Sequence, residues 1–162
     1  MIEQNDIIIQ SWKQLCEEVY HDSWKPDMGR YRSDYAFRGL SDKNYELKNS
    51  FLRNCGEKPE LEYHLLRNFR KYSINADPQL TGTFWRALVL AQHHGLPTRL
   101  IDWTYSPFIA MHFATANTER YDTDGIIWKV DFVKVNQLVP APFSDGLRIE
   151  KCNAFTLEML EK

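Results

Sequence analysis

The chain has 162 residues, a formal net charge of −2 and a hydrophobic fraction of 43%. This length suits one domain with its own core, and the composition is that of a globular protein rather than a disordered or fibrous one. The near-neutral charge argues against a protein that coats nucleic acid non-specifically, but it allows a site for one compact anionic ligand. Aromatic residues are abundant, with 9 Phe, 8 Tyr and 5 Trp, and such rings both fill cores and stack on bases.

The cysteines and the apolar stretches of the sequence indicate the cellular compartment in which the protein is expected. Cys16, Cys55 and Cys152 are odd in number, far apart and in no C-x-x-C pair, which argues against a disulfide framework and a zinc knuckle. The chain shows no secretory signal, and charges interrupt its apolar stretches well before the length of a membrane span. We therefore expect a cytoplasmic protein with no membrane association.

The first third of the chain predicts one helix and one strand. Ser11 and Gln14 have the S-x-x-Q spacing of a capping box, and the apolar residues that follow recur at helical spacing, which predicts a helix over residues 11–20. A polar stretch with Pro and Gly predicts a loop over 21–34. Tyr35 to Gly39 is typical of a short strand that ends in a glycine turn, whereas residues 47–53 leave helix and strand open.

Two helices are expected in the middle of the chain. Pro59 suits the first turn of a helix that extends to about residue 72, and Glu60 and Glu62 are interpreted as part of its solvated face. Residues 75–82 predict a loop. A further helix is expected over 83–94, because Gly95 is a suitable C-terminal stop.

The last part of the chain mixes extended and helical segments. We expect an extended segment over 98–103, a helix from Pro107 to about Ala116, and strands over 126–132 and 133–139, while the end from Leu147 has strand or helix character. Helices come first and strands are interleaved later, which favours an α+β fold. The prediction is a small mixed or antiparallel sheet flanked by helices, in one domain over residues 1–162.

The densest group of polar and aromatic residues lies between two predicted helices, at residues 92–107. Arg99 and Asp102 stand in an apolar setting, and each would need a partner if buried. They either serve a site or hold two helices together. His93 and His94 point about 100° apart on a helix and do not suit one metal ion, so no metal site is expected. One of them could act as a donor or base, or cap the helix end.

A second candidate is the tripeptide Phe37-Arg38-Gly39. An Arg at a strand end offers a fixed fork of donors, and a neighbouring Gly allows close approach of a ligand, for which a diphosphate is the best match. The alternative is an ordinary surface Arg. No nucleophile elbow, Walker-type loop or dinucleotide glycine motif is present.

Together these segments resemble the FRG domain, a family named for its Phe/Tyr-Arg-Gly motif. The resemblance covers about residues 12–155. It rests on Phe37-Arg38-Gly39, Leu47-Lys-Asn-Ser-Phe-Leu-Arg53, Leu61-Glu-Tyr-His-Leu-Leu-Arg-Asn-Phe69, Gln92-His-His-Gly-Leu-Pro-Thr-Arg-Leu-Ile-Asp-Trp-Thr104, Ser106-Pro107 and Ala110 to Ala114.

The resemblance implies a fold like that of ADP-ribosyltransferases, with NAD as the substrate that donates ADP-ribose and no metal. Arg38 would grip the NAD pyrophosphate or ribose, Thr104 would take the Ser/Thr position of the second strand, and Trp103 or Tyr105 would stack on nicotinamide. Glu150 is the candidate for the third catalytic position, although Cys152 and Ala154 differ from the Gln and Gly expected nearby. The predicted catalytic residues are Arg38, Thr104, His93 and Glu150; the predicted NAD-binding residues are Phe37, Arg38, Gly39, Arg99, Asp102, Trp103, Thr104 and Tyr105.

The implied activity is that of a toxin or phage-defence effector that modifies a macromolecular target, RNA or protein, with an antitoxin as a further partner. A non-enzymatic module that binds a nucleotide or a nucleic-acid end in the same pocket is the alternative. A third reading, phosphodiesterase or nuclease chemistry through His93 or His94 and Asp102, has no metal-ligand spacing behind it.

Overall fold

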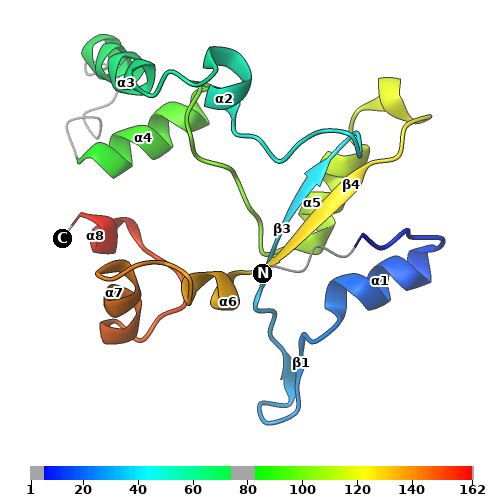
Figure 1. The fold of residues 1–162 in the computed structure, drawn as a ribbon. Helices are drawn as coiled ribbons and strands as arrows, with labels where there is room; N and C mark the ends of the chain where they lie inside the picture. Colours follow the sequence, from blue (N-terminus) through cyan, green and yellow to red (C-terminus); the bar gives the residue numbers. More distant parts are fainter. Residues whose placement is uncertain (1–5, 74–82, 162) are drawn as a thin grey trace. The chain divides into compact units, whose positions relative to one another are not determined.

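A computed structural model describes residues 6–73 and 83–161. The chain divides into two compact units, each built from two separate stretches of sequence. Unit 1 combines residues 1–43 with 103–138, and unit 2 combines residues 44–102 with 139–162. Figure 1 shows the elements along the chain. The loop predicted over 75–82 lies outside the described residues, and the single domain over 1–162 stays a prediction.

Unit 1 begins with the predicted helix. α1 spans Trp12–Tyr20, and the Oγ of Ser11 accepts the N–H of Gln14 at 3.1 Å. The Gln14 side chain accepts the N–H of Gln10 in return, at 2.7 Å, so the capping box is confirmed. Lys129 ties the other end of α1 to the sheet, since its Nζ donates to the carbonyl of Glu18 at 2.8 Å. Burial of the Lys129 ammonium group lowers its pKa, because the charged form loses contact with water.

The stretch predicted as a loop over 21–34 contains a short hairpin. β1 (Trp24–Lys25) pairs antiparallel with β2 (Arg30–Tyr31). Trp24 and Tyr31 stand opposite each other with their ring centroids 5.1 Å apart. Strands of two residues are too short to show an alternating pattern, so the loop prediction was wrong at this point.

The main sheet of unit 1 confirms two predicted strands. β3 (Tyr35–Leu40) pairs antiparallel with β4 (Ile126–Asp131). On the other edge of β3, an isolated bridge joins Phe37 to Thr104. Gly39 lies inside β3 rather than in a turn, which corrects the predicted glycine turn at this residue. The fold is α+β with antiparallel pairing, as predicted.

Helix α5 (Pro107–Thr115) packs directly on β3. A Cβ built on Gly39 would lie 1.8 Å from the backbone oxygen of Ala110, so only glycine allows this approach. Val19, Phe37 and Ala110 form the buried core between α1, β3 and α5. The short helix η2 (Thr118–Arg120) follows α5.

The second strand predicted after β4, over 133–139, is wrong. The chain forms helix α6 (Phe132–Asn136) instead. The Oδ1 of Asp131 accepts the N–H of Lys134 at 2.9 Å and caps the first turn. Val133 and Val135 gave the segment its strand-like alternation, and the cap overrides their propensity.

Removing this cap gives a first testable result. We expect Asp131→Ala to lower the free energy of unfolding by about 1 kcal/mol, the usual contribution of an N-cap side chain. Asp131→Asn keeps an acceptor at the same place and serves as the control, with stability close to that of the wild type. Urea titrations followed by circular dichroism measure both, and equal losses for the two variants would rule out capping as the cause.

Unit 2 is helical and confirms the helices predicted in the middle of the chain. Gly95, with φ at 85°, ends α4 as expected. The buried core lies between α3 and α4 and consists of Leu66, Ala87, Leu88 and Ala91. No helix in the two described ranges is long and apolar enough to cross a membrane. The helices of this unit are α2 (Ser50–Cys55), α3 (Glu60–Ser73), α4 (Phe84–His93), α7 (Phe143–Ile149) and α8 (Leu157–Leu160).

Candidate functional site

The Phe-Arg-Gly tripeptide lies in the middle of β3, and its side chains alternate across the sheet. Phe37 is 1% exposed in the core beneath α5, and Gly39 faces the same helix. Arg38 therefore projects from the opposite face, where it is half-buried. The space around Gly39 is filled by α5, so this packing accounts for the missing side chain.

Trp128 stands directly across the sheet from Arg38. In the β3–β4 register the two residues are partners, so their side chains share one face. The indole Nε1–H of Trp128 is buried, and no acceptor for it occurs among the described residues. A buried donor without an acceptor costs about 1–3 kcal/mol, so an acceptor that reaches this N–H would be stabilised by it.

Thr104 joins the second predicted motif to the first through the backbone. The N–H of Phe37 donates to the carbonyl of Thr104 at 2.7 Å, and the N–H of Thr104 donates back at 2.9 Å. Directly opposed residues share a face, so the Thr104 side chain lies on the side of Phe37 and not on that of Arg38. Its Oγ1 accepts the N–H of Ser106 at 3.1 Å and thereby shapes the start of α5.

The aromatic residues beside Thr104 are both largely exposed. Trp103 precedes it and Tyr105 follows it. The ring of Tyr105 meets the ring of Phe132 with centroids 5.5 Å apart. Unit 1 thus brings together Phe37, Arg38, Gly39, Trp103, Thr104 and Tyr105, six of the predicted site residues.

In unit 2, Arg99 forms an ion pair with Glu62 of α3. Both its Nε and one terminal nitrogen lie 2.6 Å from the carboxylate, and its backbone N–H donates to the same group at 2.7 Å. The Glu62 side chain is 5% exposed and that of Arg99 is 56% exposed. The interpretation of Glu62 as part of a solvated helix face was therefore wrong. A signal was present, since Glu62, Leu66 and Phe69 share one helical stripe and Leu66 is in the core.

Asp102 is bound to α4. The amide Nε2 of Gln92 donates to Asp102, and its Oε1 accepts the hydroxyl proton of the fully buried Thr98. Thr98 in turn accepts, at its carbonyl, the N–H of Phe51 at 3.1 Å. This network, with the Arg99–Glu62 pair, fastens the extended segment to α2, α3 and α4. Arg99 thus ties the extended segment to α3 and Asp102 ties it to α4, in keeping with the alternative in which the two residues hold helices together.

Comparison with known families bears on the same residues. A family model described as the FRG domain matches residues 33–123, more than half of the chain. The chain belongs to the FRG domain family. Searches among curated proteins and among solved structures gave no significant match.

The FRG match includes some of the residues discussed above and excludes others. It contains the Phe-Arg-Gly strand, Glu62 with its partner Arg99, and the bridge to Thr104, and it ends before β4. Trp128, which sequence reasoning missed, therefore lies outside the matched range. Only the alternation along β4 could have indicated it, by placing Trp128 on the face opposite Ile127.

The two remaining predicted catalytic residues of this FRG domain lie at helix ends in unit 2. His93 is exposed at the end of α4, with its ring 5.6 Å from that of His94. Glu150 is exposed and directly follows α7, so the segment from Leu147, which left strand and helix open, is helical here. Within the two described ranges, no three His, Cys, Asp or Glu side chains gather as a metal site requires.

Proposed function

We propose that this FRG domain binds NAD on the Arg38 face of the β3–β4 sheet and transfers ADP-ribose to a macromolecular target. The observation that carries the proposal is the pairing of Arg38 with Trp128. A guanidinium suits the two phosphates of a diphosphate, and the indole N–H beside it requires an acceptor that a phosphate or amide oxygen supplies.

The reaction in this proposal breaks the bond between the ribose and nicotinamide and forms a bond from the same ribose carbon to a nucleophile of the target. Nicotinamide leaves with the electron pair of the broken bond. A carboxylate stabilises the positive charge that develops on the ribose, and Glu150 is the residue that we assign to it. The resemblance further suggests a toxin or defence effector that acts in the cytoplasm on RNA or protein.

A second candidate, a module that binds a nucleotide without turning it over, is favoured by two observations. The Thr104 hydroxyl is used at the start of α5 and projects from the face opposite Arg38. Glu150 follows a helix instead of lying on a strand of the sheet. This candidate keeps the same nucleotide face and predicts binding with no release of nicotinamide.

Calorimetric titration of the full chain with NAD tests whether the proposed face binds the nucleotide. A nicotinamide-release assay then distinguishes the transferase from the module that binds without turnover. We expect Arg38→Ala to weaken NAD binding at least tenfold because it removes the fork of donors. Arg67→Ala, which removes an exposed charge from α3, is the matched control and should bind as the wild type does. Release of nicotinamide that Glu150→Gln abolishes supports the transferase, and binding without release supports the module.

One result would contradict both the transferase and the binding module. A folded wild-type chain that shows no binding at millimolar NAD has no nucleotide site of this kind. Equal NAD affinities for Arg38→Ala and Arg67→Ala would place any site away from the Phe-Arg-Gly strand.

A further inference from the structure

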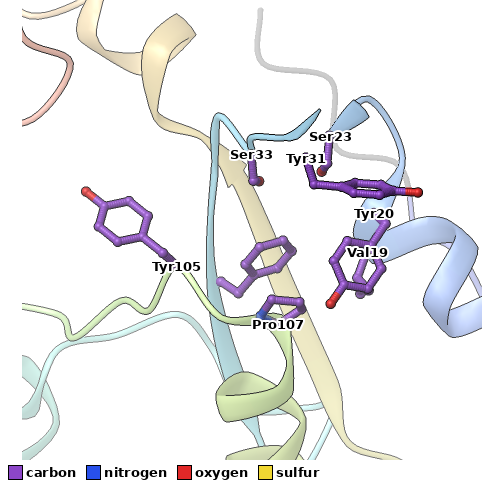
Figure 2. Close-up of a pocket in the computed structure, with 8 residues that line it drawn as sticks. Val19, Tyr20, Ser23, Tyr31, Ser33, Tyr105 and Pro107 are labelled. Carbon is purple, nitrogen blue, oxygen red and sulfur yellow. The ribbon is translucent and has the colours of Figure 1, made fainter. Parts of the chain in front are cut away.

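A pocket lies in unit 1, on the face of β3 that Arg38 does not share. Its volume is about 250 Å³, and Phe37 forms part of its wall. This is smaller than the pockets of about 300–1,000 Å³ that hold drug-sized ligands, so it has room for one ring system and not for a whole dinucleotide. Figure 2 shows the side chains around it. The lining residues are Val19, Tyr20, Ser23, Tyr31, Ser33, Phe37, Tyr105 and Pro107.

The lining is aromatic and carries no acidic or basic side chain. In Figure 2 the phenol hydroxyl of Tyr31 points away from the pocket, so the ring of Tyr31 is what a ligand would meet. The Tyr31 ring is 66% exposed and lies 5.9 Å from that of Tyr20, centroid to centroid. Rings presented in this way bind planar, uncharged groups by stacking.

The Ser23 hydroxyl is a buried polar group in the wall of this pocket. Ser23 is 2% exposed, and its Oγ makes no hydrogen bond to any of the described residues. The Ser33 hydroxyl, in contrast, already accepts the N–H of Tyr35 at 3.1 Å. A buried hydroxyl without a partner is unfavourable, so Ser23 favours a ligand with a hydrogen-bonding atom at the edge of its ring.

Exposed rings extend from this pocket over the surface of unit 1. Tyr20 lies 6.1 Å from Phe108, and Phe108 lies 6.3 Å from Trp12, centroid to centroid. Trp24 in turn packs against Tyr31 of the pocket, with the two ring centroids 5.1 Å apart. Trp12, Trp24 and Phe108 are all exposed, and connected aromatic surface of this kind marks a binding site.

We propose that this aromatic pocket binds a nucleobase, with the ring stacked on Tyr31 and its polar edge hydrogen-bonded to Ser23. Bases combine a flat, uncharged ring with donors and acceptors at the rim, which is what this lining selects. The base comes from a free nucleoside or from single-stranded nucleic acid, whose successive bases would follow the neighbouring rings. The site does not depend on the proposed NAD face, because Phe37 and Arg38 project to opposite sides of β3.

Equilibrium titrations of the full chain with adenosine, AMP and a four-nucleotide single-stranded RNA test this pocket. We expect adenosine and AMP to bind within a few-fold of each other, because no lining side chain carries a charge. Tighter binding of the RNA identifies the single strand as the source of the base, and equal affinity identifies the nucleoside. Arg38→Ala should leave adenosine binding unchanged, which distinguishes this pocket from the NAD face.

Two variants locate the base. Ser23→Ala removes a buried hydroxyl that makes no hydrogen bond to the described residues, so it should keep the stability of the wild type and weaken adenosine binding several-fold. Tyr31→Ala should weaken it about tenfold or more through loss of stacking. Tyr121→Ala, an exposed tyrosine of unit 1 outside the pocket, is the control. Adenosine that fails to bind at millimolar concentration, or binds Ser23→Ala and Tyr31→Ala as it binds the wild type, overturns the proposal.

Discussion

Replacing Gly39 with alanine is expected to destabilise the protein by about 3 kcal/mol or more, the upper end of what an overpacked core costs. The added Cβ would lie 1.8 Å from the Ala110 oxygen and 2.8 Å from the backbone nitrogen of Ala114. Both are backbone atoms of α5, so the clash is relieved only if the helix moves away from β3. Loss of the cooperative unfolding transition in urea, or a strongly lowered midpoint, is the measurement.

Gly146 provides the matched control for this substitution. It lies in α7, and a Cβ built there meets nothing within 4 Å. Gly146→Ala should therefore raise stability by about 0.5–1 kcal/mol, because alanine has the higher helix propensity. If Gly39→Ala is as well tolerated as Gly146→Ala, then α5 does not pack on the Phe-Arg-Gly strand as described.

The second large effect is expected at Arg99. Arg99→Ala leaves the buried Glu62 carboxylate without its counter-ion and should cost about 3 kcal/mol, the lower end for a broken buried pair because Arg99 itself is half exposed. Glu62→Gln leaves only a solvated guanidinium and keeps an acceptor for the Arg99 backbone N–H, so about 1 kcal/mol is expected. Urea unfolding followed by tryptophan fluorescence gives both values.

The order of these two losses is the informative result. A structural pair predicts that Arg99→Ala is the more damaging, and that the double variant loses less than the sum of the single losses. Arg67→Ala, an exposed arginine of α3, controls for the change in net charge and should stay within about 0.5 kcal/mol of the wild type. Wild-type stability of Arg99→Ala, together with weakened NAD binding, would instead identify Arg99 as a ligand-binding residue.

Local signals sufficed for much of the fold. The Ser11–Gln14 capping box, the Gly95 stop and the period of two along residues 126–131 each act within a few residues, and each structure they predicted is present. The segment after Asp131 shows the limit of this approach. Its valines alternate as in a strand, while a single side-chain cap decides for a helix.

Long-range pairings were beyond local patterns. Glu62 and Arg99 are 37 positions apart, and although the helical stripe of Glu62 with Leu66 indicates a covered face, it does not identify Arg99 as the partner. The partnership of Arg38 with Trp128 depends on the register between two distant strands. Sequence motifs placed Arg38 and Thr104 on one list of candidate site residues, but only the strand pairing shows that their side chains project from opposite faces of β3.

The two family motifs also differ in what their residues do. In the segment 92–102, Gln92, Thr98 and Arg99 are bound to neighbouring elements of unit 2. Arg38 lies on the same sheet face as Trp128, whose buried indole N–H has no acceptor among the described residues. Several residues of the longer motif therefore make packing contacts within unit 2, and our proposal assigns ligand recognition to the Phe-Arg-Gly strand.

The most direct test of the NAD face is an NMR titration that follows the indole N–H signal of Trp128. The chain has 5 tryptophans, and Trp128→Phe assigns the signal by removing it. We predict that NAD shifts the Trp128 indole resonance strongly in the wild type, and much less in Arg38→Ala, because the ligand supplies the missing acceptor. An unchanged Trp128 signal at saturating NAD would contradict the proposed site.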